Sequence, residues 1–382
     1  MGIHVIKSGE TLSKIAKLYE VPLDTLVSAN QVPDKDRLVV GQTLVIPTAS
    51  YQISSAKPTI DVSAYLDPRI TRDLSGQTID QVGRDLTYLA LFSHAVNQNG
   101  NLSPLDDQAP IAAAKRNRVA PLLVLTNYIG GQFSRDLATA IFNDVNLQDY
   151  ILDQALFLME EKGYQGLDFD FEYLGGDNRL GYLHFLQRAA AKVKPHGYFL
   201  SAAVAPKVSG EQRGILYEGH DYAGIGQIVD FMFIMTYEWG WSGGEPMAVS
   251  PVNLVRNVMN YAVNVIPRHK IMMGIPLYGY DWTLPHVPGK WARSISSQQA
   301  LKLAIQYGVQ IHYSKTSQAP WFKYRDLQGR QHEVWFEDAR SIQSKFDLVK
   351  QLGIRGFYYW VLGHEFPQNW LLLEENFMVR KW

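Results

Sequence analysis

The chain has 382 residues, which is too long for one average domain but suits a barrel of about 250 residues plus a small module. Its 36 basic and 37 acidic residues give a net charge of −1, which argues against nucleic acid or an anionic membrane as a partner. Because cysteine is absent, disulfides, thiolate nucleophiles and zinc–thiolate sites are excluded. We therefore expect two domains in a monomer, with no nucleic-acid or membrane partner.

The N-terminus opens with Met1-Gly2-Ile3-His4-Val5 and lacks the charged and then apolar segments of a signal peptide. Position 6 is Ile, where a myristoylation signal requires Ser or Thr. No apolar run approaches the roughly 18 residues of a membrane span. We expect a soluble chain without a visible signal peptide.

Residues 3–47 predict a strand, two helices and a second strand. The first strand is expected at 4–7, and apolar residues at helical spacing predict helices over 12–19 and 23–30. The closing strand is expected within 38–47. These elements predict a small domain at 1–48, and the polar, small residues of 49–57 predict a linker.

This N-terminal segment resembles a LysM module over its whole length, in the runs HVIKSGETLSKIAKLYEV, LVSANQV and LVVGQTLVIP. The resemblance implies a βααβ module that binds N-acetylglucosamine-containing glycans such as peptidoglycan or chitin. The residues expected to form its groove are Gly9, Glu10, Thr11, Leu12, Asn30, Gln31 and Val32. Without the resemblance, the residues alone leave a general interaction domain equally open.

From Pro58 to the end of the chain, apolar strand-like runs alternate with longer helical stretches. This alternation is typical of βα units on a parallel sheet. Strands are predicted near 59–65, 86–92, 121–127, 165–172, 198–204, 229–236, 270–277 and 354–360. Eight such strands predict an α/β fold, a (β/α)8 TIM barrel over 58–382, with its active site at the carboxyl ends of the strands.

Between the seventh and eighth predicted strands the chain is too long for one helix. Residues 294–307 have helical periodicity, and 310–313, 321–324 and 333–336 are expected strands. We predict a small α+β insertion over about 283–340 that walls one side of the barrel mouth.

Three acids lie in the predicted fourth strand, within the run GYQGLDFDFEY. In a strand, Asp168, Asp170 and Glu172 share one face at a spacing of about 6.5–7 Å, and the apolar residues share the other. Such close carboxylates do not all ionise readily, so Asp168 and Asp170 are expected to share a proton, with Glu172 nearest the mouth. The residues alone also leave open a carboxylate-only magnesium site.

The same run resembles the D-x-x-D-x-D-x-E signature of glycoside hydrolase family 18, and the resemblance extends over 58–382. It implies that Glu172 is the general acid/base and that Asp170, tuned by Asp168, orients the substrate's own 2-acetamido group. That group supplies the nucleophile, so the reaction retains configuration without a metal or cofactor. The first signature position is Gln165, which is expected deep in the barrel, within hydrogen-bonding reach of Asp168.

Further family landmarks follow along the chain. The run FIMTYE at 233–238 resembles the family's M-x-Y-D, and Tyr237 is expected to bond the acetamido carbonyl. The run RGFYYW at 355–360 resembles the eighth strand, whose final Trp carries the reacting sugar. The expected substrate-binding residues are Trp360, Met235, Glu238, Asn127, Tyr280 and Trp239; the loop residues Trp241 and Trp282 stay open between groove and packing.

The pairing of a LysM module with a family-18 barrel, and the run MTYEWGW after strand six, resemble the spore cortical fragment-lytic enzymes and related spore germination N-acetylglucosaminidases. This resemblance implies retaining hydrolysis of the β-1,4 bond after N-acetylglucosamine in peptidoglycan, at the spore coat, cortex or cell wall. Two alternatives remain open: a chitinase acting on chitin oligomers, and a glycan-binding protein without catalysis.

Overall fold

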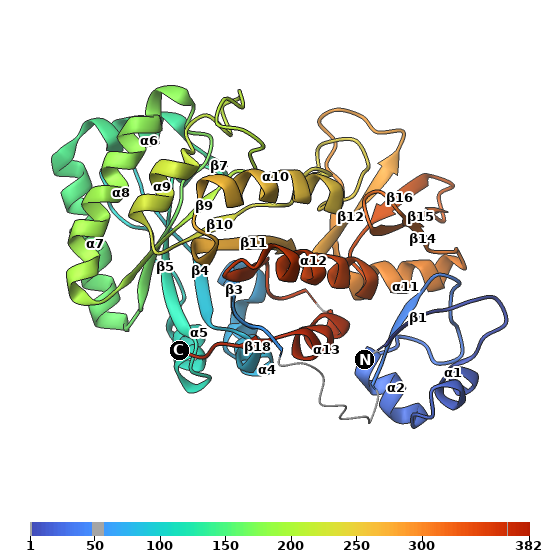
Figure 1. Ribbon diagram of the computed structural model, residues 1–382. Coiled ribbons are helices and arrows are strands. Elements are labelled where there is room, and N and C mark those ends of the chain that lie inside the picture. The colour runs from blue at the N-terminus through green and yellow to red at the C-terminus, as the bar shows by residue number, and fades with distance from the viewer. Residues whose placement is uncertain (1, 48–56, 365) are drawn as a thin grey trace.

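The structure is a computed structural model that describes residues 2–47, 57–364 and 366–382. Eight parallel strands follow one another around a closed barrel, in which the last strand pairs with the first (Figure 1). The strands are β3 (Thr59–Leu66), β4 (Tyr88–Ala95), β5 (Ala120–Thr126), β8 (Gly166–Asp170), β9 (Phe199–Val204), β10 (Phe231–Ile234), β11 (Ile271–Pro276) and β17 (Gly356–Trp360). The predicted TIM barrel is confirmed, and each strand overlaps its predicted range.

Helices surround the barrel on its outer face (Figure 1). They are α3 (Pro68–Thr71), α4 (Ser75–Val82), α5 (Gln108–Arg116), α6 (Arg135–Asn143), α7 (Val145–Lys162), α8 (Arg179–Val193), α9 (Tyr222–Ile228), α10 (Val252–Val265), α12 (Ala339–Leu352) and α13 (Pro367–Asn376), with single 3-10 turns at Arg72–Leu74, Gly83–Asp85, Gly176–Asn178, Lys194–His196 and Arg268–Lys270. Side chains cap several of them; Asp144, for example, accepts two backbone N–H groups at the start of α7. A short strand, β18 (Met378–Val379), pairs with the first residues of β3 and fixes the C-terminal segment there.

Strand β8 sends alternate side chains to two different layers. Leu167 and Phe169 are fully buried in the apolar layer between barrel and helices. The alternate residues, Asp168 and Asp170, point into the barrel, where Asp168 contacts Tyr65 of β3. The predicted separation of an acidic and an apolar face is therefore present in this strand.

A lobe with its own antiparallel sheet is inserted between β11 and α12. Its elements are β12 (Tyr278–Leu284), β13 (Arg293–Ser296), α11 (Ser297–Tyr307), β14 (His312–Ser314), β15 (Ala319–Arg325) and β16 (Gln331–Trp335), in the sheet order β13-β12-β16-β15-β14. The predicted α+β insertion is confirmed, but its sheet begins at Tyr278. Its helix begins three residues later than predicted, because Arg293–Ser296 pairs with β12 and Ser296 caps the helix.

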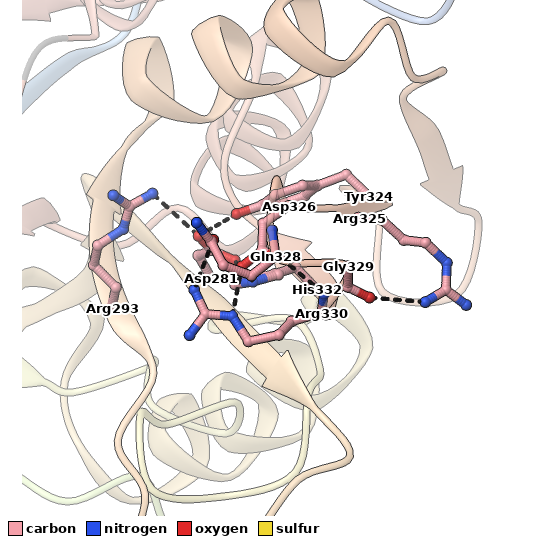
Figure 2. Close-up of polar contacts among 9 residues, drawn as sticks. All are labelled: Asp281, Arg293, Tyr324, Arg325, Asp326, Gln328, Gly329, Arg330 and His332. Carbon is pink, nitrogen blue, oxygen red and sulfur yellow. Dashed lines mark hydrogen bonds and ion pairs between the residues drawn. The ribbon is translucent and has the colours of Figure 1, made fainter.

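Asp281 of β12 is the centre of a polar network inside this lobe (Figure 2). Its carboxylate accepts a hydrogen bond from the Tyr324 hydroxyl at 2.8 Å and lies 3.1 Å from Nη2 of Arg293. His332 lies between two carboxylates, with Nδ1 2.9 Å from Asp281 and Nε2 3.2 Å from Asp326. These contacts join four strands of the lobe, β12, β13, β15 and β16, to the turn before β16.

The N-terminal module contains β1 (Gly2–Val5), α1 (Leu12–Leu18), α2 (Leu23–Asn30) and β2 (Thr43–Ile46), with β1 and β2 antiparallel. The predicted βααβ order is confirmed. The closing strand is shorter than predicted because the chain turns at Gly41, which has φ +88. Val39, before this turn, packs instead into the apolar core of the inserted lobe.

The module is docked against the inserted lobe and α13 (Figure 1). The amide of Gln368 in α13 donates to Oδ1 of Asn30 at 2.9 Å and to the carbonyl of Thr43 at 2.7 Å. The backbone N–H of Ile311 donates to the carbonyl of Val40 at 2.9 Å. The approach is close enough that a Cβ added at Gly41 would lie 1.9 Å from the carbonyl oxygen of Ile311.

Most of the predicted linker at 49–57 falls outside the described residues, and the domain boundaries at 48 and 58 stay predictions. In the ranges that the structure describes, no helix is both long and apolar enough to cross a bilayer.

Candidate active site

A cleft of about 690 Å³ opens at the carboxyl ends of the barrel strands. Its lining is mostly aromatic and acidic: Asp67, Arg69, Phe92, Tyr128, Phe133, Asp170, Glu172, Tyr173, Pro206, Leu216, Tyr217, Met235, Tyr237, Glu238, Trp239, Trp241 and Trp360. The structure thus brings most of the predicted barrel residues together. The exceptions are Asp168, Asn127 and Tyr280, which lie behind the lining.

Asp168 lies beneath the cleft and is fully buried. The Tyr65 hydroxyl donates to its Oδ2 at 2.5 Å, and the Ser201 hydroxyl donates to its Oδ1 at 2.6 Å. Burial raises the pKa of Asp168 to about 6, although the two hydrogen bonds act in the opposite direction. Both oxygens are therefore occupied by hydroxyl groups.

Asp170 has a different environment, although it is only two residues away. Its Oδ1 is buried without a hydrogen-bond partner among the described residues. Burial raises the pKa of Asp170 well above its ordinary value. The negative charges of Glu172 and, to a lesser extent, Asp168 act in the same direction. No hydrogen bond joins the Asp168 and Asp170 carboxyls in the described structure, so the expected sharing of a proton between them is not seen. The negative charge of Glu172 affects the pKa of Asp170 more than that of Asp168 does.

Gln165 does not reach Asp168, contrary to expectation. It lies just before β8, and its side-chain amide donates to the carbonyl of Gly163 at 3.2 Å. Position 168 is three positions after 165. Because side chains of an extended chain alternate between two faces, those of Gln165 and Asp168 point to opposite faces. The replacement at this signature position therefore leaves the hydrogen bonds of Asp168 untouched.

Glu172 lies two residues after the end of β8 and is partly exposed to the cleft. Burial of its carboxyl, with a smaller contribution from the negative charge of Glu238, raises its pKa to about 8. A carboxyl group with that pKa carries its proton at neutral pH and can donate it. The next residue, Tyr173, has φ +56, a conformation that non-glycine residues adopt rarely and that marks a constrained turn at the site.

Asn127 holds the backbone of Glu172. Its Oδ1 accepts from the Glu172 N–H at 3.0 Å, and its Nδ2 donates to the Glu172 carbonyl at 2.9 Å and to the Ser134 carbonyl at 3.0 Å. Asn127 is fully buried. Its amide bonds the backbone of both Glu172 and Ser134 and does not line the cleft, so the structure does not support the expectation that it binds sugar directly.

His220 makes a second contact with this loop, which no sequence motif predicted because the histidines are scattered without a paired spacing. Its Nε2 donates to the carbonyl of Phe171 at 2.8 Å, and its Nδ1 accepts from the backbone N–H of Ala205 at 2.9 Å. Burial lowers the pKa of His220 to about 4, so the ring is neutral at physiological pH. Asn127 and His220 together fix the backbone on both sides of the 171–172 peptide.

Tyr237 follows β10 and lines the cleft. Its hydroxyl lies 3.0 Å from that of Tyr358, and burial raises its pKa well above the ordinary value, so the phenol keeps its proton. Gly274 of β11 leaves room for the ring, since a Cβ there would lie 2.8 Å from Cε1 of Tyr237. Met235 lies in the same lining, as predicted.

Glu238 also lines the cleft, and burial raises the pKa of its carboxyl. Its Oε1 accepts hydrogen bonds from the hydroxyls of Tyr278 and, at 2.9 Å, Tyr280. Tyr280 is nearly buried behind Glu238 and does not line the cleft, so its predicted sugar contact is wrong. Because Glu238 is one methylene longer than Asp, it reaches these two tyrosines of the inserted lobe; its φ is +67.

Trp360 ends β17 and lines the cleft as predicted, with its ring centroid 5.0 Å from that of Phe92. Trp239 and Trp241 also line it, and Trp241 is 45% exposed. Trp282 is buried and donates to the carbonyl of Gly244, which makes it a packing residue. The sequence did not single out five further lining residues, which belong to no motif: Phe92 in β4, Tyr128 and Phe133 in one short hairpin after β5, and the loop residues Tyr173 and Tyr217.

A second groove, of about 650 Å³, lies on the N-terminal module. The predicted residues Glu10, Thr11 and Leu12 line it, together with the segment 35–39 and with Ile305 and Gly308 of the inserted lobe. The other predicted residues, Gly9, Asn30, Gln31 and Val32, do not line it. Asn30 is instead buried, where it bonds the backbone of Val45 and the side chain of Gln368.

In the parts of the chain that the structure describes, no group of three His, Asp or Glu side chains is arranged to hold a metal ion. Asp168, Asp170 and Glu172, whose residue types left a magnesium site open, do not form such a group.

Comparison with known proteins agrees with this geometry. The family model for glycosyl hydrolases family 18 matches residues 69–365, and the LysM domain model matches residues 4–47. The cortical fragment-lytic enzyme of Bacillus subtilis (strain 168) is 40% identical over 431 aligned positions, which cover 100% of this chain and 99% of that protein. The enzyme of the same name from Bacillus anthracis is 43% identical over 427 positions, with 99% of each chain covered.

Solved structures give the same result. The spore cortex-lytic enzyme SleL of Bacillus megaterium superposes with a TM-score of 0.94 at 39% identity, covering 99% of this chain and 98% of that one. SleL of Bacillus cereus superposes with a TM-score of 0.83 at 42% identity, covering 99% and 87%. The chain is a glycoside hydrolase and belongs to the glycosyl hydrolases of family 18, with a LysM domain at its N-terminus.

Proposed function

We propose that this glycoside hydrolase is a retaining N-acetylglucosaminidase that cleaves the β-1,4 bond after N-acetylglucosamine in the peptidoglycan of spore cortex fragments. One observation carries the proposal. A carboxyl group that is protonated at neutral pH, Glu172, shares one cleft with Asp170, Tyr237 and the aromatic floor of Trp360. This set supplies an acid, a group to orient an amide, a hydroxyl donor and a stacking surface.

In the first step, Glu172 donates its proton to the glycosidic oxygen while the carbonyl oxygen of the 2-acetamido group attacks the anomeric carbon. The bond to the leaving sugar breaks and an oxazolinium ion forms. Asp170 accepts from the acetamido N–H and balances the positive charge, and the Tyr237 hydroxyl donates to the acetamido oxygen. Because the nucleophile is part of the substrate, no second carboxylate has to bond to carbon.

In the second step, Glu172 is an anion and takes a proton from water. That water attacks the anomeric carbon from the face that the leaving sugar vacated, and the oxazolinium ring opens to restore the acetamido group. The two inversions give net retention, and the acid is regenerated. The contacts of Asn127 and His220 support this cycle, because they hold the backbone that carries Glu172.

The choice of substrate rests on the relatives and on the N-terminal module. The similar full-length proteins are named for lysis of cortical fragments or of spore cortex. A LysM module beside the barrel is suited to hold an N-acetylglucosamine polymer near the cleft. We accordingly place the activity at the spore cortex or cell wall, with chitin oligomers as the alternative substrate of the same chemistry.

The mechanism is tested with a β-linked N-acetylglucosamine oligosaccharide and an analogue in which the 2-acetamido group is replaced by hydroxyl. We expect hydrolysis of the first, with the β-anomer seen first by NMR, and no hydrolysis of the second. Initial release of the α-anomer, or equal rates for both compounds, would contradict substrate assistance. The variant Glu172→Gln is expected to lose turnover but keep binding to insoluble glycan, because the LysM groove is separate from the cleft.

A further inference from the structure

The cleft contains one cation among the described residues that line it. That cation is Arg69; the ionisable carboxyl groups in the lining are those of Asp67, Asp170, Glu172 and Glu238. Chitin is neutral, so it offers a guanidinium group no opposite charge to pair with. The position of Arg69 therefore bears on which polymer is recognised.

Arg69 is held in a fixed orientation. Its Nε donates to Oδ1 of Asp67 at 2.8 Å, and its Nη2 donates to Oδ2 of the same carboxylate at 2.8 Å. Asp67 is itself buried and caps α3 through the backbone N–H of Arg69. This forked pairing on one edge of the guanidinium leaves less rotational freedom to lose when a ligand binds.

The other edge of the guanidinium is available. Arginine has five N–H donors, and none of the hydrogen bonds of the described structure uses Nη1 of Arg69. The Arg69 side chain is 57% exposed, whereas that of Asp67 is 10% exposed. Asp67 therefore leaves N–H groups on Arg69 that can donate to a second carboxylate, one bound in the cleft.

Arg69 lies close to the subsite for the reacting sugar. Its Cζ is 5.5 Å from the centroid of the Phe92 ring, which is in turn 5.0 Å from the centroid of Trp360. One aromatic side chain thus separates the guanidinium from the surface on which the reacting sugar stacks. This distance places Arg69 beside the adjoining sugar rather than the reacting one.

We propose that Arg69 is a specificity residue that binds the carboxylate carried on the 3-O-substituent of a muramic acid next to the reacting N-acetylglucosamine. The inference rests on the proposed cleavage after N-acetylglucosamine. In a strand that alternates the two sugars, an N-acetylglucosamine on Trp360 has a muramic acid on each side. Where that muramic acid carries a free carboxylate, on its lactyl group or on an attached L-alanine, the negative charge adjoins the reacting sugar whichever end of the cleft Arg69 occupies. Chitin offers only an uncharged hydroxyl at that position.

The test measures binding by calorimetry in the Glu172→Gln background, so that no ligand is consumed. Three tetrasaccharides of equal length are compared: the muramic-acid form with free lactyl carboxylates, the same form capped as methylamides, and the tetramer of N-acetylglucosamine. Adding Arg69→Gln is expected to weaken the free-acid ligand by about tenfold to a hundredfold, since one charge-assisted hydrogen bond is lost. The two uncharged ligands are expected to change by less than about threefold.

A fourth ligand, in which L-alanine is linked to the lactyl group, moves the carboxylate outward. The carboxylate that Arg69 recognises, lactyl or alanyl, is the one whose ligand loses more affinity in Arg69→Gln. The matched control is Arg72→Gln, which makes the same charge change three residues away, outside the cleft lining. It should leave all affinities unchanged.

Removing Arg69 leaves the buried Asp67 without its ion pair, so the double variant Asp67→Asn, Arg69→Gln is measured as well. It keeps a neutral pair at that corner and is expected to show the same selective loss. If both variants bind charged and uncharged ligands with equally reduced affinity, Arg69 only stabilises the local fold, and the proposal is overturned. An unchanged affinity for the free-acid ligands would overturn it as well. Failure of the proposed function would be seen in a different measurement. The protein with Glu172 intact would then release no reducing N-acetylglucosamine ends from cortex, independently of the ligand affinities of the Arg69 variants.

Discussion

At the scale of single residues, the proton on Glu172 depends on its surroundings. Burial and the negative charge of Glu238 raise the pKa of Glu172 to about 8, so the acid is lost as the pH rises through that value. We expect kcat/KM to fall on the alkaline side near pH 8. The variant Glu238→Gln removes the second charge, lowers the pKa of Glu172 and should shift this limb to lower pH.

The control for this pH profile is Glu245→Gln, which removes a carboxylate from an exposed position after β10. Its alkaline limb should coincide with that of the wild type. An unchanged limb in Glu238→Gln, or a shift to higher pH, would contradict the assignment of Glu172 as the acid.

Asn127 provides a second prediction at this scale. Replacing it with Ala removes both hydrogen bonds to the backbone of Glu172, so the acid loses its fixed position. We expect kcat to fall by about tenfold or more with a smaller change in KM, because the acid is displaced while the aromatic lining stays in place. Steady-state kinetics on an N-acetylglucosamine oligosaccharide measures both values.

The exposed Asn146→Ala serves as the control for the Asn127 variant, since it makes the same side-chain change at the start of α7. A rise in KM with unchanged kcat for Asn127→Ala would instead indicate direct sugar binding, as the sequence suggested.

Sequence motifs predicted the lining residues Asp170, Glu172, Tyr237 and Trp360, because each follows or ends a strand of the barrel. They could not assign Asn127, since hydrogen bonds between two loops depend on how those loops meet in space. The same limit explains why His220 was missed. Only the error at Gln165 was avoidable, because strand alternation alone places it opposite Asp168.

At the scale of elements, the close packing of β11 against β10 and Tyr237 depends on a glycine in β11. Gly274 has no side chain, and a Cβ there would lie 2.8 Å from both the Tyr237 ring and the carbonyl of Ile234. The variant Gly274→Ala should therefore displace Tyr237, lower kcat and reduce the free energy of unfolding by about 1–3 kcal/mol. Activity assays and denaturant unfolding measure the two effects.

Gly76→Ala is the matched control, because a Cβ at that position of α4 meets its nearest atom at an ordinary 3.4 Å. It should keep full activity and gain slightly in stability, as alanine favours helix over glycine. If Gly274→Ala also keeps full activity, the position of Tyr237 is not critical.

The eight strands and the inserted lobe were predictable because apolar runs of strand length alternate with helical periods. Strand β12 was missed, since Tyr278–Leu284 follows β11 after one residue and reads as its loop. β12 pairs with the next strand, β13, and also with β16, which follows only after α11, β14 and β15. The network around Asp281 likewise depends on residues from separate strands (Figure 2).

At the scale of the whole molecule, the LysM domain is fixed to the catalytic domain. Gln368 of α13 donates to Asn30 and Thr43 of the LysM domain, and all three are buried. Gln368→Ala removes both of these buried hydrogen bonds, at a cost of about 1–3 kcal/mol. We expect faster hydrogen exchange in residues 38–46 and unchanged hydrolysis of short oligosaccharides.

Gln351→Ala, on the exposed end of α12, is the control and should leave exchange in 38–46 unchanged. Equal exchange in Gln368→Ala and wild type would show that the two domains are not held together by this contact. The docking itself was not predictable, because the sequence shows two modules and an expected linker but not the surfaces that meet.

The central claim is that the cleft cuts after N-acetylglucosamine in cortex peptidoglycan. It is tested most directly by incubating wild type and Glu172→Gln with purified cortex fragments and, separately, with chitin oligomers, and identifying the new reducing ends by mass spectrometry. We predict that wild type releases reducing N-acetylglucosamine ends from cortex and that Glu172→Gln releases none. Reducing muramic acid ends, cleavage of chitin alone, or no product from either polymer would contradict the account.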